Sequence, residues 1–561
     1  MNKQQINIRG QHGQTTLVIV LALSVFLFGF IALAVDFSNL WFHRQTAQTA
    51  ADAACEAGAM DVLLSAQGYP VDTTNAGFTP GSGFNCSTAV TSPNKSPSPC
   101  VYASLNGYAG GGLLTSPNRE SNEVAVSFPG TIPNVTVPPA AIAPVPFLQV
   151  DVTDRVRVFF SAMFTGNRTQ DVRASARCGL QLAKAPIPII VLHPTKSASF
   201  NITGNPLIHI YGGPKQSIQV NSESTTAVQY PWGNSLVDLS QGGSNLPPSG
   251  SDFGTFGGPV LPPCTPNCSN LNLGTTGTWL YQSPPISDPF AGIPVPTTAG
   301  MTTNPTPDTG VTYAPAPATA TTDPYCPVPT GSSATCKRYY PGNYPDGITI
   351  TNENALFAPG VYYLGSGTCT GTGSSKCDLT LGSNSLARPS AFTNGNTTGG
   401  TMFYFSGHST LQLGSNSGGG NFPGSVTPTP FPNSDVQCPS GAPPVPAITD
   451  VLAGNVFLGP CTGTYGDPLA QYRGMLFFHD RTVATDNVLN GGGGILVAGN
   501  LYFHQNTSFG TTLGLWGGSC SNTRILGDII VDELDMQGNS CINMQLNPNA
   551  AYNILKVALL Q

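Results

Sequence analysis

Six acidic residues of the C-terminal third are the side chains whose types and spacing could support chemistry. They lie in the segments FFHDRTVATDN and GDIIVDELD and are Asp480, Asp486, Asp528, Asp532, Glu533 and Asp535. Two carboxylates held a few ångströms apart provide the acid and base with which glycosidases cleave sugar chains. Asp532 and Glu533 are neighbours in a strand-like segment, so their side chains should point to opposite faces.

Two histidines extend this set. His479 and His504 each follow two aromatic residues and lie 25 positions apart, close to one coil of a protein built from stacked strands. On one face with Asp480 they would form a polar patch for a sugar or an ion. The alternative, which we prefer, places them as solvent-facing residues at strand ends. The sequence shows no Ser-His-Asp order, HExxH motif, phosphate-binding loop or dinucleotide glycine pattern. We therefore expect no catalytic residue and no cofactor.

The cysteines indicate an oxidising compartment. Twelve of the 14 fall into near neighbours within segments rich in Pro, Gly, Ser and Asn: Cys86/Cys100, Cys264/Cys268, Cys326/Cys336, Cys369/Cys377, Cys438/Cys461 and Cys520/Cys541. An even number of loop cysteines is typical of disulfides. The segment CTPNC could be half of a metal site, but no second pair or histidine cluster lies nearby, and we expect no metal.

The overall composition favours a β-rich protein outside the cytoplasm. Only 9% of the 561 residues are charged, against about a quarter in ordinary soluble domains. Glycine and proline contribute 65 and 51 residues, so turns and loops must be numerous. The net charge of −7 includes no basic stripe, which argues against a nucleic-acid partner.

An uncharged segment near the N-terminus predicts a membrane anchor. Residues 15–35 carry no charge and would form a helix of about 31 Å, the thickness of the bilayer hydrocarbon core. Lys3 and Arg9 precede this segment and Asp36 follows it, which predicts a cytoplasmic N-terminus and an external remainder. A cleaved signal peptide is the alternative, with Ala32-Leu33-Ala34 as the site, although the apolar run exceeds a usual signal core.

The helical pattern continues beyond Asp36. Apolar and small residues recur at helical spacing from Phe37 to Ala57, and Trp41 would lie at the outer membrane interface. Alanines at 47, 50, 51 and 54 would allow another backbone to approach closely. The whole stretch resembles a long pilin-type helix, and an anchor followed by a stalk helix is the alternative.

These residues resemble a known family, the TadE/TadG-like proteins of Flp-pilus assembly. The resemblance is carried by GQTTLVIVLAL and AVDFSNLWFHRQTAQTAADAACEAGA, and by YASLNGY, NEVAVSF and LQVDVTDRVRVFF downstream, covering about residues 9–180. No glutamate follows Gly10 or Gly13 at the spacing of prepilin-peptidase substrates, which favours the TadG-like branch and leaves processing open. Some relatives carry an Asp-x-Ser-x-Ser metal site; the nearest string, DLSQG, lacks the second serine.

The resemblance implies a pilin-like α+β region at 36–183, between a cytoplasmic tail at 1–14 and a transmembrane helix at 15–35 on one side and the rest of the chain on the other. It also implies that the helix packs on the sheet, which would bring Cys55 next to Cys178 in a disulfide. Two unpaired buried thiols are the alternative. The expected location is the bacterial inner membrane, crossed once, with the bulk of the chain periplasmic or extracellular.

Residues 184–561 have a different pattern, in which strand-like pieces of four to six residues alternate with Gly and Asn turns. This pattern predicts a right-handed β-helix or related solenoid, with a β-sandwich as the alternative. Two Pro/Gly/Ser/Thr-rich inserts, about 240–345 and 415–465, are expected to be loops or partly disordered. The fold class is thus mainly β, with an N-terminal transmembrane helix and a pilin-like α+β head.

Two classes of function are consistent with these features. The first is a non-catalytic envelope protein for pilus assembly, anchoring or adhesion, whose partners are the inner membrane, pilus-assembly proteins or pilin subunits, and surface glycans. The second is a membrane-anchored carbohydrate-active enzyme. Three acidic side chains converging within about 6 Å on one exposed groove would favour the enzyme. The scarcity of acids and the resemblance favour the envelope protein.

Overall fold

The computed structural model divides the chain into two compact units, Met1–Leu182 with Leu555–Gln561, and Ala183–Ile554. We call these unit 1 and unit 2. The structure describes residues 12–66, 79–86, 97–116, 118–138, 140, 143–184, 187–229, 235–243, 249–265, 268–314, 318–323, 325–326, 335–367, 377–382, 385–390, 392, 401–413, 456–458, 472, 475–490, 495–517, 523–545 and 553–560.

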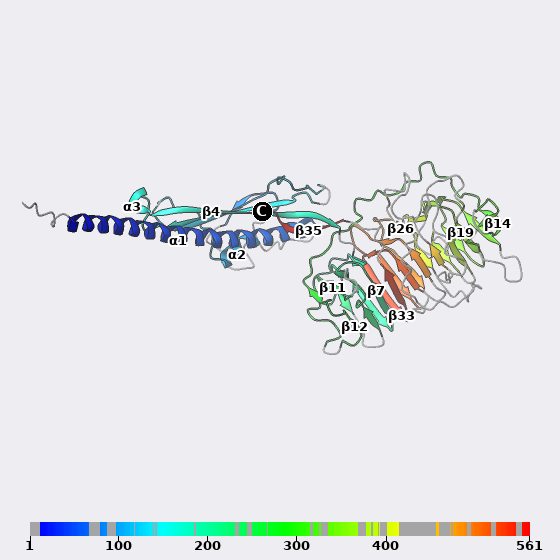
Figure 1. Ribbon diagram of the computed structural model, residues 1–561. Coiled ribbons are helices and arrows are strands. Elements are labelled where there is room, and N and C mark those ends of the chain that lie inside the picture. The colour runs from blue at the N-terminus through cyan, green and yellow to red at the C-terminus, as the bar shows by residue number, and fades with distance from the viewer. Residues whose placement is uncertain are drawn as a thin grey trace, which may run out of the picture. The chain divides into compact units, whose positions relative to one another are not determined.

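Unit 1 consists of one long helix and an antiparallel sheet (Figure 1). The helices are α1 (His12–Ala66), α2 (Ser98–Leu105) and the short α3 (Ala162–Thr165). The sheet runs in the order β1 (Phe84–Asn85), β2 (Ser121–Ser127), β3 (Phe147–Arg157), β4 (Thr169–Lys184) and β35 (Asn553–Leu559). Strands β1 to β4 pair antiparallel, and β35 lies next to β4 although unit 2 separates them in sequence.

The second half of α1 packs on this sheet through its alanines. Ala47, Ala50, Ala51 and Ala54 are fully buried in one core with β3 and β4. At Gly58 a Cβ would lie 2.8 Å from Pro99 of α2 and 2.9 Å from Leu148 of β3, so only glycine fits without displacing them. The close approach expected from the alanine pattern is therefore present. The large apolar residues of the first half, from Leu17 to Val35, are exposed.

Two disulfides fasten unit 1. Cys55 of α1 is bonded to Cys178 of β4, with 5.9 Å between the Cα atoms, which is the pairing that the resemblance implied. Cys86 is bonded to Cys100 of α2, with a Cα separation of 5.4 Å. The first bond joins the long helix to the sheet, and the second joins α2 to the residue that follows β1.

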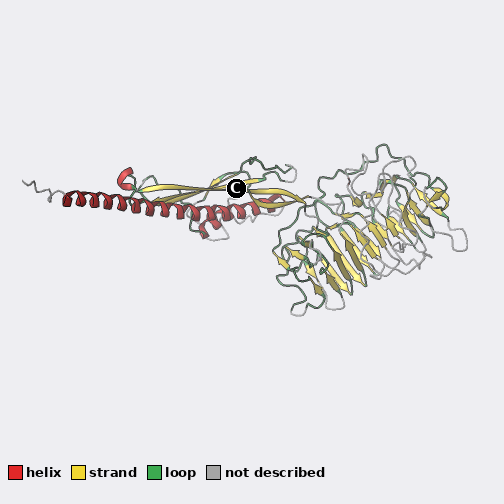
Figure 2. Cartoon of the chain, in the orientation of Figure 1, coloured by secondary structure: helices red, strands yellow, loops and turns green. Residues whose placement is uncertain are grey.

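Unit 2 is built from three sheets whose strands pair in parallel, except that β14 (Asp308–Tyr313) pairs antiparallel with β16 (Cys336–Tyr339) (Figure 2). In spatial order, the ten-stranded sheet contains β13 (Trp279–Tyr281), β11 (Asp252–Thr255), β8 (Gln216–Val220), β5 (Ile189–Val191), β32 (Ile529–Val531), β29 (Asn500–Phe503), β26 (Met475–His479), β23 (Thr401–Phe405), β20 (Gly360–Leu364) and β17 (Gly342–Tyr344). The eight-stranded sheet contains β18 (Ile348–Ile350), β21 (Leu379–Leu381), β24 (Leu411–Leu413), β27 (Asp486–Asn490), β30 (Thr512–Trp516), β33 (Glu533–Gly538), β6 (Phe200–Gly204) and β9 (Val228–Gln229).

The third sheet has twelve strands in the order β12 (Leu271–Asn272), β10 (Leu236–Asp238), β7 (Leu207–Tyr211), β34 (Cys541–Gln545), β31 (Thr523–Leu526), β28 (Ile495–Ala498), β25 (Val456–Leu458), β22 (Leu386–Pro389), β19 (Asn354–Phe357), β16 (Cys336–Tyr339), β14 (Asp308–Tyr313) and β15 (Thr322–Asp323). From β17 onward the chain visits the three sheets in turn, so each strand pairs in parallel with the strand three places later. Inward-facing residues such as Phe357, Phe403 and Phe477 form one continuous core.

The order of the coils does not follow the sequence. The first coil, β5-β6-β7, lies in the middle of the stack and continues through β8 to β13 at one end. The chain resumes coiling at the other end with β17 and returns to β32-β33-β34, which pairs in parallel with the first coil. Both ends of unit 2 therefore lie on adjacent coils.

The insert expected to be loop at 240–345 contains regular structure, including β11, β13, β14 and β16. Within it, Ile286 and Phe290 are buried against Tyr404, Phe478 and Tyr502 on the outer face of the ten-stranded sheet. The described part of this insert thus contains strands as well as loops, and the loop at 286–293 is held by its buried apolar side chains. The second insert lies outside the described residues except for β25.

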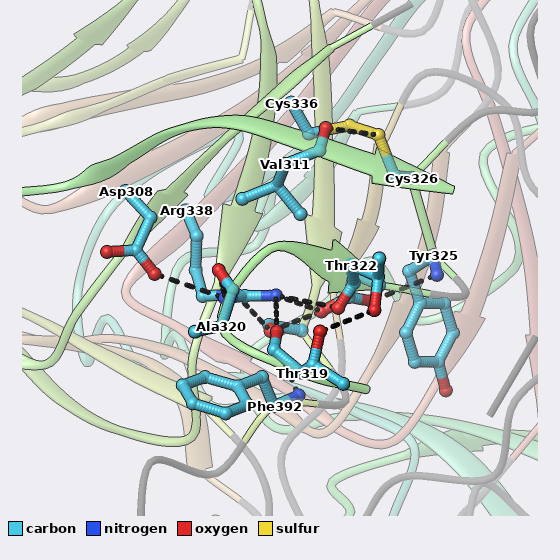
Figure 3. Close-up of polar contacts among 12 residues, drawn as sticks. Asp308, Val311, Thr319, Ala320, Thr322, Tyr325, Cys326, Cys336, Arg338 and Phe392 are labelled. Atoms are coloured by element: carbon cyan, nitrogen blue, oxygen red, sulfur yellow. Dashed lines mark hydrogen bonds and ion pairs between the residues drawn. A yellow bond between two sulfur atoms is a disulfide. The ribbon is translucent and has the colours of Figure 1, made fainter. Parts of the chain in front are cut away.

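A buried arginine closes one end of the stack (Figure 3). The fully buried guanidinium of Arg338 on β16 donates to Asp308 at 3.1 Å and to Asp323 at 3.2 Å. It also donates to three carbonyl groups, those of Thr319, Ala320 and Thr322. The nearby Cys326–Cys336 disulfide joins the same loop to β16. Together these contacts attach the 319–326 loop to the coil at the β16 end of the stack.

Candidate functional site

The first candidate site is the point where α1 leaves its apolar run. The carboxylate of Asp36 accepts hydrogen bonds from three consecutive backbone amides, those of Phe159 at 2.9 Å, Phe160 at 2.8 Å and Ser161 at 2.6 Å. These residues form the turn between β3 and β4, just before α3. Backbone amides in a turn need acceptors outside the strand ladder, and the Asp36 carboxylate supplies one for each of these three. Asp36 thereby fixes to α1 the turn between β3 and β4, which we call the β3–β4 tip.

A second group of polar contacts holds the same end of β3 on α1. His43 Nδ1 lies 2.9 Å from Asp154, and the Tyr108 hydroxyl donates to Asp154 at 3.1 Å. Burial and the neighbouring Asp154 raise the pKa of Tyr108 to about 12, so the phenol keeps its proton at neutral pH. The Asn39 side chain donates to the carbonyl of Arg157 at 3.2 Å. The tip is therefore held over two turns of α1.

The tip also has an apolar surface. Phe159, Phe160 and Met163 are 56%, 42% and 83% exposed. Ser161 of the tip and residues of α1 line an open apolar groove of about 350 Å³ whose helical side consists of Phe30, Leu33, Ala34, Asp36, Phe37 and Leu40. Sequence reasoning missed this site. The sequence feature that could have indicated it is VFFSAM, an apolar run between two strands where a polar turn is usual.

His479 and His504 do not share a polar patch, and the preferred expectation that they face solvent at strand ends is wrong as well, because both are buried. His479 is buried, with Nε2 2.7 Å from the Thr485 hydroxyl, and burial lowers its pKa to about 4. Neighbouring Asp480 accepts from the backbone amides of Thr482 and Gly407. A bulge between Met475 and Phe477 shifts the register, so that Phe478 pairs with Tyr502. The equivalent spacing becomes 24 residues instead of 25, which puts the two histidines on opposite faces.

His504 belongs to a buried network that fastens the 286–293 segment. Its Nδ1 lies 2.5 Å from Asp532, and although burial opposes the charged form, this contact and the nearby Asp288 raise the histidine pKa. The Tyr502 hydroxyl donates to Asp288 at 2.7 Å and accepts from Arg481 at 2.7 Å. Arg481 also donates to the carbonyls of Phe290 and Ile293. The polar groups of His504, Tyr502 and Arg481 therefore make structural contacts that hold the 286–293 segment on the sheet.

The remaining predicted carboxylates divide into two sets. Asp528 is fully buried, its oxygens have no hydrogen-bond partner among the described residues, and burial raises its pKa well above the usual value. Asp486, Glu533 and Asp535 instead line an open groove of about 400 Å³ on the eight-stranded sheet. Glu533 is paired with Lys196, and Asp535 accepts from Asn201 at 2.7 Å and from Gln537 at 2.6 Å.

An aromatic side chain completes this second groove. Trp516 is 41% exposed, and its indole lies over Gly514, where a Cβ would be 2.9 Å from the ring nitrogen. Glycine at this position lets the ring lie flat on the strand. The groove therefore combines an aromatic face with hydrogen-bonding side chains.

The predicted disulfide cysteines of unit 2 are described in part. Cys264 is bonded to Cys268 and Cys326 to Cys336. Cys377 and Cys541 are also disulfide-bonded. The expected neighbours Cys369 and Cys520, and the pair Cys438 and Cys461, lie outside the described residues.

Comparison with known proteins finds a similarity over most of α1. Residues 13–61 match the family model described as putative Flp pilus-assembly TadE/G-like. The match covers the apolar run, Asp36 and the alanine helix through Gly58, and it confirms the resemblance over these residues. No curated protein and no solved structure matches the chain. By length and composition, α1 is suited to crossing a membrane.

Proposed function

We propose that the chain is a single-pass, membrane-anchored envelope protein that acts without catalysis in the assembly or anchoring of a Flp-type pilus. The observation that carries the proposal is the family match over residues 13–61, which contains the apolar run and the helix following it. Lys3 and Arg9 on one side and the disulfides on the other support a cytoplasmic N-terminus and an external remainder.

The fold supports the same proposal. A long N-terminal helix packed through its second half on an antiparallel sheet corresponds to a pilin-like head. We assign unit 2 to the β-helix class on the basis of its three mainly parallel sheets and continuous core. In this arrangement unit 2 is an external module carried by the anchored unit.

A role in adhesion is supported by the groove with Trp516. Aromatic faces beside hydrogen-bonding side chains are suited to sugar rings, so a surface glycan is the proposed occupant. Glu533 and Asp535 are already held by neighbouring polar side chains, which favours binding over the acid and base roles of a carbohydrate-active enzyme. Replacing Trp516 with alanine should abolish retention on a glycan array, and polysaccharide hydrolysis by the wild type would favour the enzyme instead.

Topology and location can be tested in cells. Protease added to spheroplasts should digest units 1 and 2 and leave a small protected N-terminal fragment. Shearing should release pilin while this protein remains with the inner membrane if it anchors the pilus. Complete protection of the chain would contradict the orientation, and recovery in the sheared fraction would show that it enters the filament.

A further inference from the structure

The β3–β4 tip carries apolar side chains that the described residues leave uncovered. Hairpin tips are usually polar because they face water. Here Phe159, Phe160 and Met163 are exposed within five positions. Their backbone is not loose, since Asp36 accepts from three amides of the same turn. A rigid turn that displays three large apolar side chains requires a partner surface.

The position of the tip identifies that surface. Ser161 lines a groove with Phe30 and Leu33, which belong to the uncharged run at 15–35. Phe30 precedes Asp36 by six positions, or about 9 Å along a helix. When the run spans a bilayer, the tip therefore lies beside the last turns of the run, at the boundary between acyl chains and headgroups.

The charged side chains around the tip are also suited to the headgroup boundary of a bilayer. Arg157 and Arg168 are exposed at the two roots of the turn, and the Arg157 guanidinium lies 5.7 Å from the centre of the Phe159 ring. Basic side chains at this level attract anionic headgroups. Trp41 and Phe42 on α1 are 57% and 60% exposed, and aromatic residues are enriched at membrane interfaces. The nearby acids Asp36 and Asp154 are occupied by hydrogen bonds within unit 1.

We propose that the β3–β4 tip is a second membrane contact, in which Phe159, Phe160 and Met163 enter the outer leaflet beside α1 and Arg157 and Arg168 bind anionic phospholipid headgroups. This inference rests on the proposed membrane anchor. It gives unit 1 two attachments to one bilayer, and two attachments restrict how a helix tilts and rotates.

Spin labelling of the full-length protein in vesicles of phosphatidylethanolamine and phosphatidylglycerol tests the proposal. A nitroxide is placed with Met163→Cys; no free cysteine occurs among the described residues, and the wild-type chain treated with the same label measures the signal of any other thiol. Phe28→Cys reports on the anchor. Leu105→Cys is the matched control, because Leu105 is an apolar residue of unit 1 that is 75% exposed on α2, away from the tip.

The labels at 163 and 28 should both collide readily with oxygen and several-fold less often with a water-soluble nickel complex than the label at 105. If the label at 28 lies in lipid but the label at 163 is accessible to the nickel complex, the second contact is overturned and the anchor remains intact. A label at 163 shielded from both reagents would show that protein covers the tip, which also refutes the lipid contact. A label at 28 in water would overturn the anchor itself.

Discussion

Asp36 shows how one side chain can set the position of a distant turn. It lies directly after the uncharged run and binds three amides more than 120 positions away in sequence. A charged acceptor makes each of these bonds stronger than a neutral one would. The tip contacts therefore depend on a residue that, in the sequence, only marks the end of the apolar run.

Replacing Asp36 with alanine should release the tip. Loss of a charged acceptor costs about 1.5–3 kcal/mol per bond, so hydrogen exchange of the Phe159, Phe160 and Ser161 amides should accelerate by about tenfold or more. Asp52→Ala is the control, because Asp52 lies on the same helix and accepts from Gln48 at 2.7 Å. Unchanged exchange in the Asp36 variant would show that the turn is held by other contacts.

Asp528 predicts a pH-dependent stability. Burial raises its pKa in the folded state, so it favours folding below its unfolded pKa of about 3.9, and this contribution is lost as the pH rises through the folded pKa. Asp528→Asn should therefore stabilise unit 2 at pH 7, by roughly 2 kcal/mol or more, and the gain should shrink toward pH 4. Thermal melts at several pH values measure this.

The exposed Asp486 provides the control for Asp528. Asp486→Asn changes a carboxylate on the same unit that is open to solvent and should leave the melting temperature nearly unchanged at every pH. Destabilisation by Asp528→Asn at pH 7 would mean that the native state uses the charged carboxylate.

Side-chain roles were only partly predictable from the sequence. His479 and His504 were expected to face solvent at strand ends, but both are buried, and a one-residue bulge in β26 puts them on opposite faces instead of in one polar patch. No residue type in MLFFHD predicts a bulge, because the bulge results from the register of the neighbouring strands. The binding of Asp36 to Phe159 was equally invisible, since it joins segments that are neighbours only after folding.

At the scale of elements, the disulfide between Cys55 and Cys178 ties the long helix to the last strand before unit 2. The bond closes a separation of 123 residues, for which the chain-entropy model gives about 5 kcal/mol of stabilisation. Replacing both cysteines with alanine should lower the unfolding temperature of unit 1 markedly, as measured by calorimetry. Cys264→Ser with Cys268→Ser removes a bond across only 4 residues and should cost much less. Equal losses would argue against the entropic account.

The Arg338 cluster predicts the behaviour of one end of unit 2. Arg338→Ala would leave the buried Asp323 without its cationic partner, and breaking a buried ion pair costs about 3–5 kcal/mol. The loop at 319–326 should then exchange its amides faster. Lys337→Ala, at the neighbouring and partly exposed position, should have little effect. If both variants behave alike, the arginine does not hold the loop.

Elements with strong local patterns were predicted best. The start of α1 follows from an uncharged run and its continuation from alanines at helical spacing, both of which are local properties. Composition predicted a loop at 286–293, and the segment is a loop. Its burial was not predictable, because it depends on where Tyr404, Phe478 and Tyr502 form the outer face of the assembled sheet.

At the scale of the whole molecule, the order of coils in unit 2 has no local signal. Ile189 pairs with Ile529, which means that the first coil is completed only when the last coil has formed. Each repeat of a stacked fold buries its core against its neighbours. Until β32-β33-β34 is in place, the first coil exposes one open edge of each sheet. Short strand patterns can predict stacking, but they cannot say which coils are adjacent.

This topology predicts that the two units fold separately. β4 and β35 are neighbours in the sheet of unit 1, so residues 12–184 joined to 553–561 by a short flexible linker should form that sheet in detergent and retain the Cys55–Cys178 bond. Residues 187–545 expressed alone should give a soluble β protein that unfolds cooperatively, because both of its ends lie on paired coils.

A fragment of unit 2 that begins at Gln216 is the discriminating variant. This fragment lacks β5, β6 and β7. In the middle of the stack, β8 and β32 would then each lose one of their two neighbouring strands. Unpaired strand edges promote association between chains, so this fragment should aggregate or split into two separately melting parts. If it folds as well as residues 187–545, the contact between the first and last coils is dispensable, and the two halves of the stack are independent solenoids.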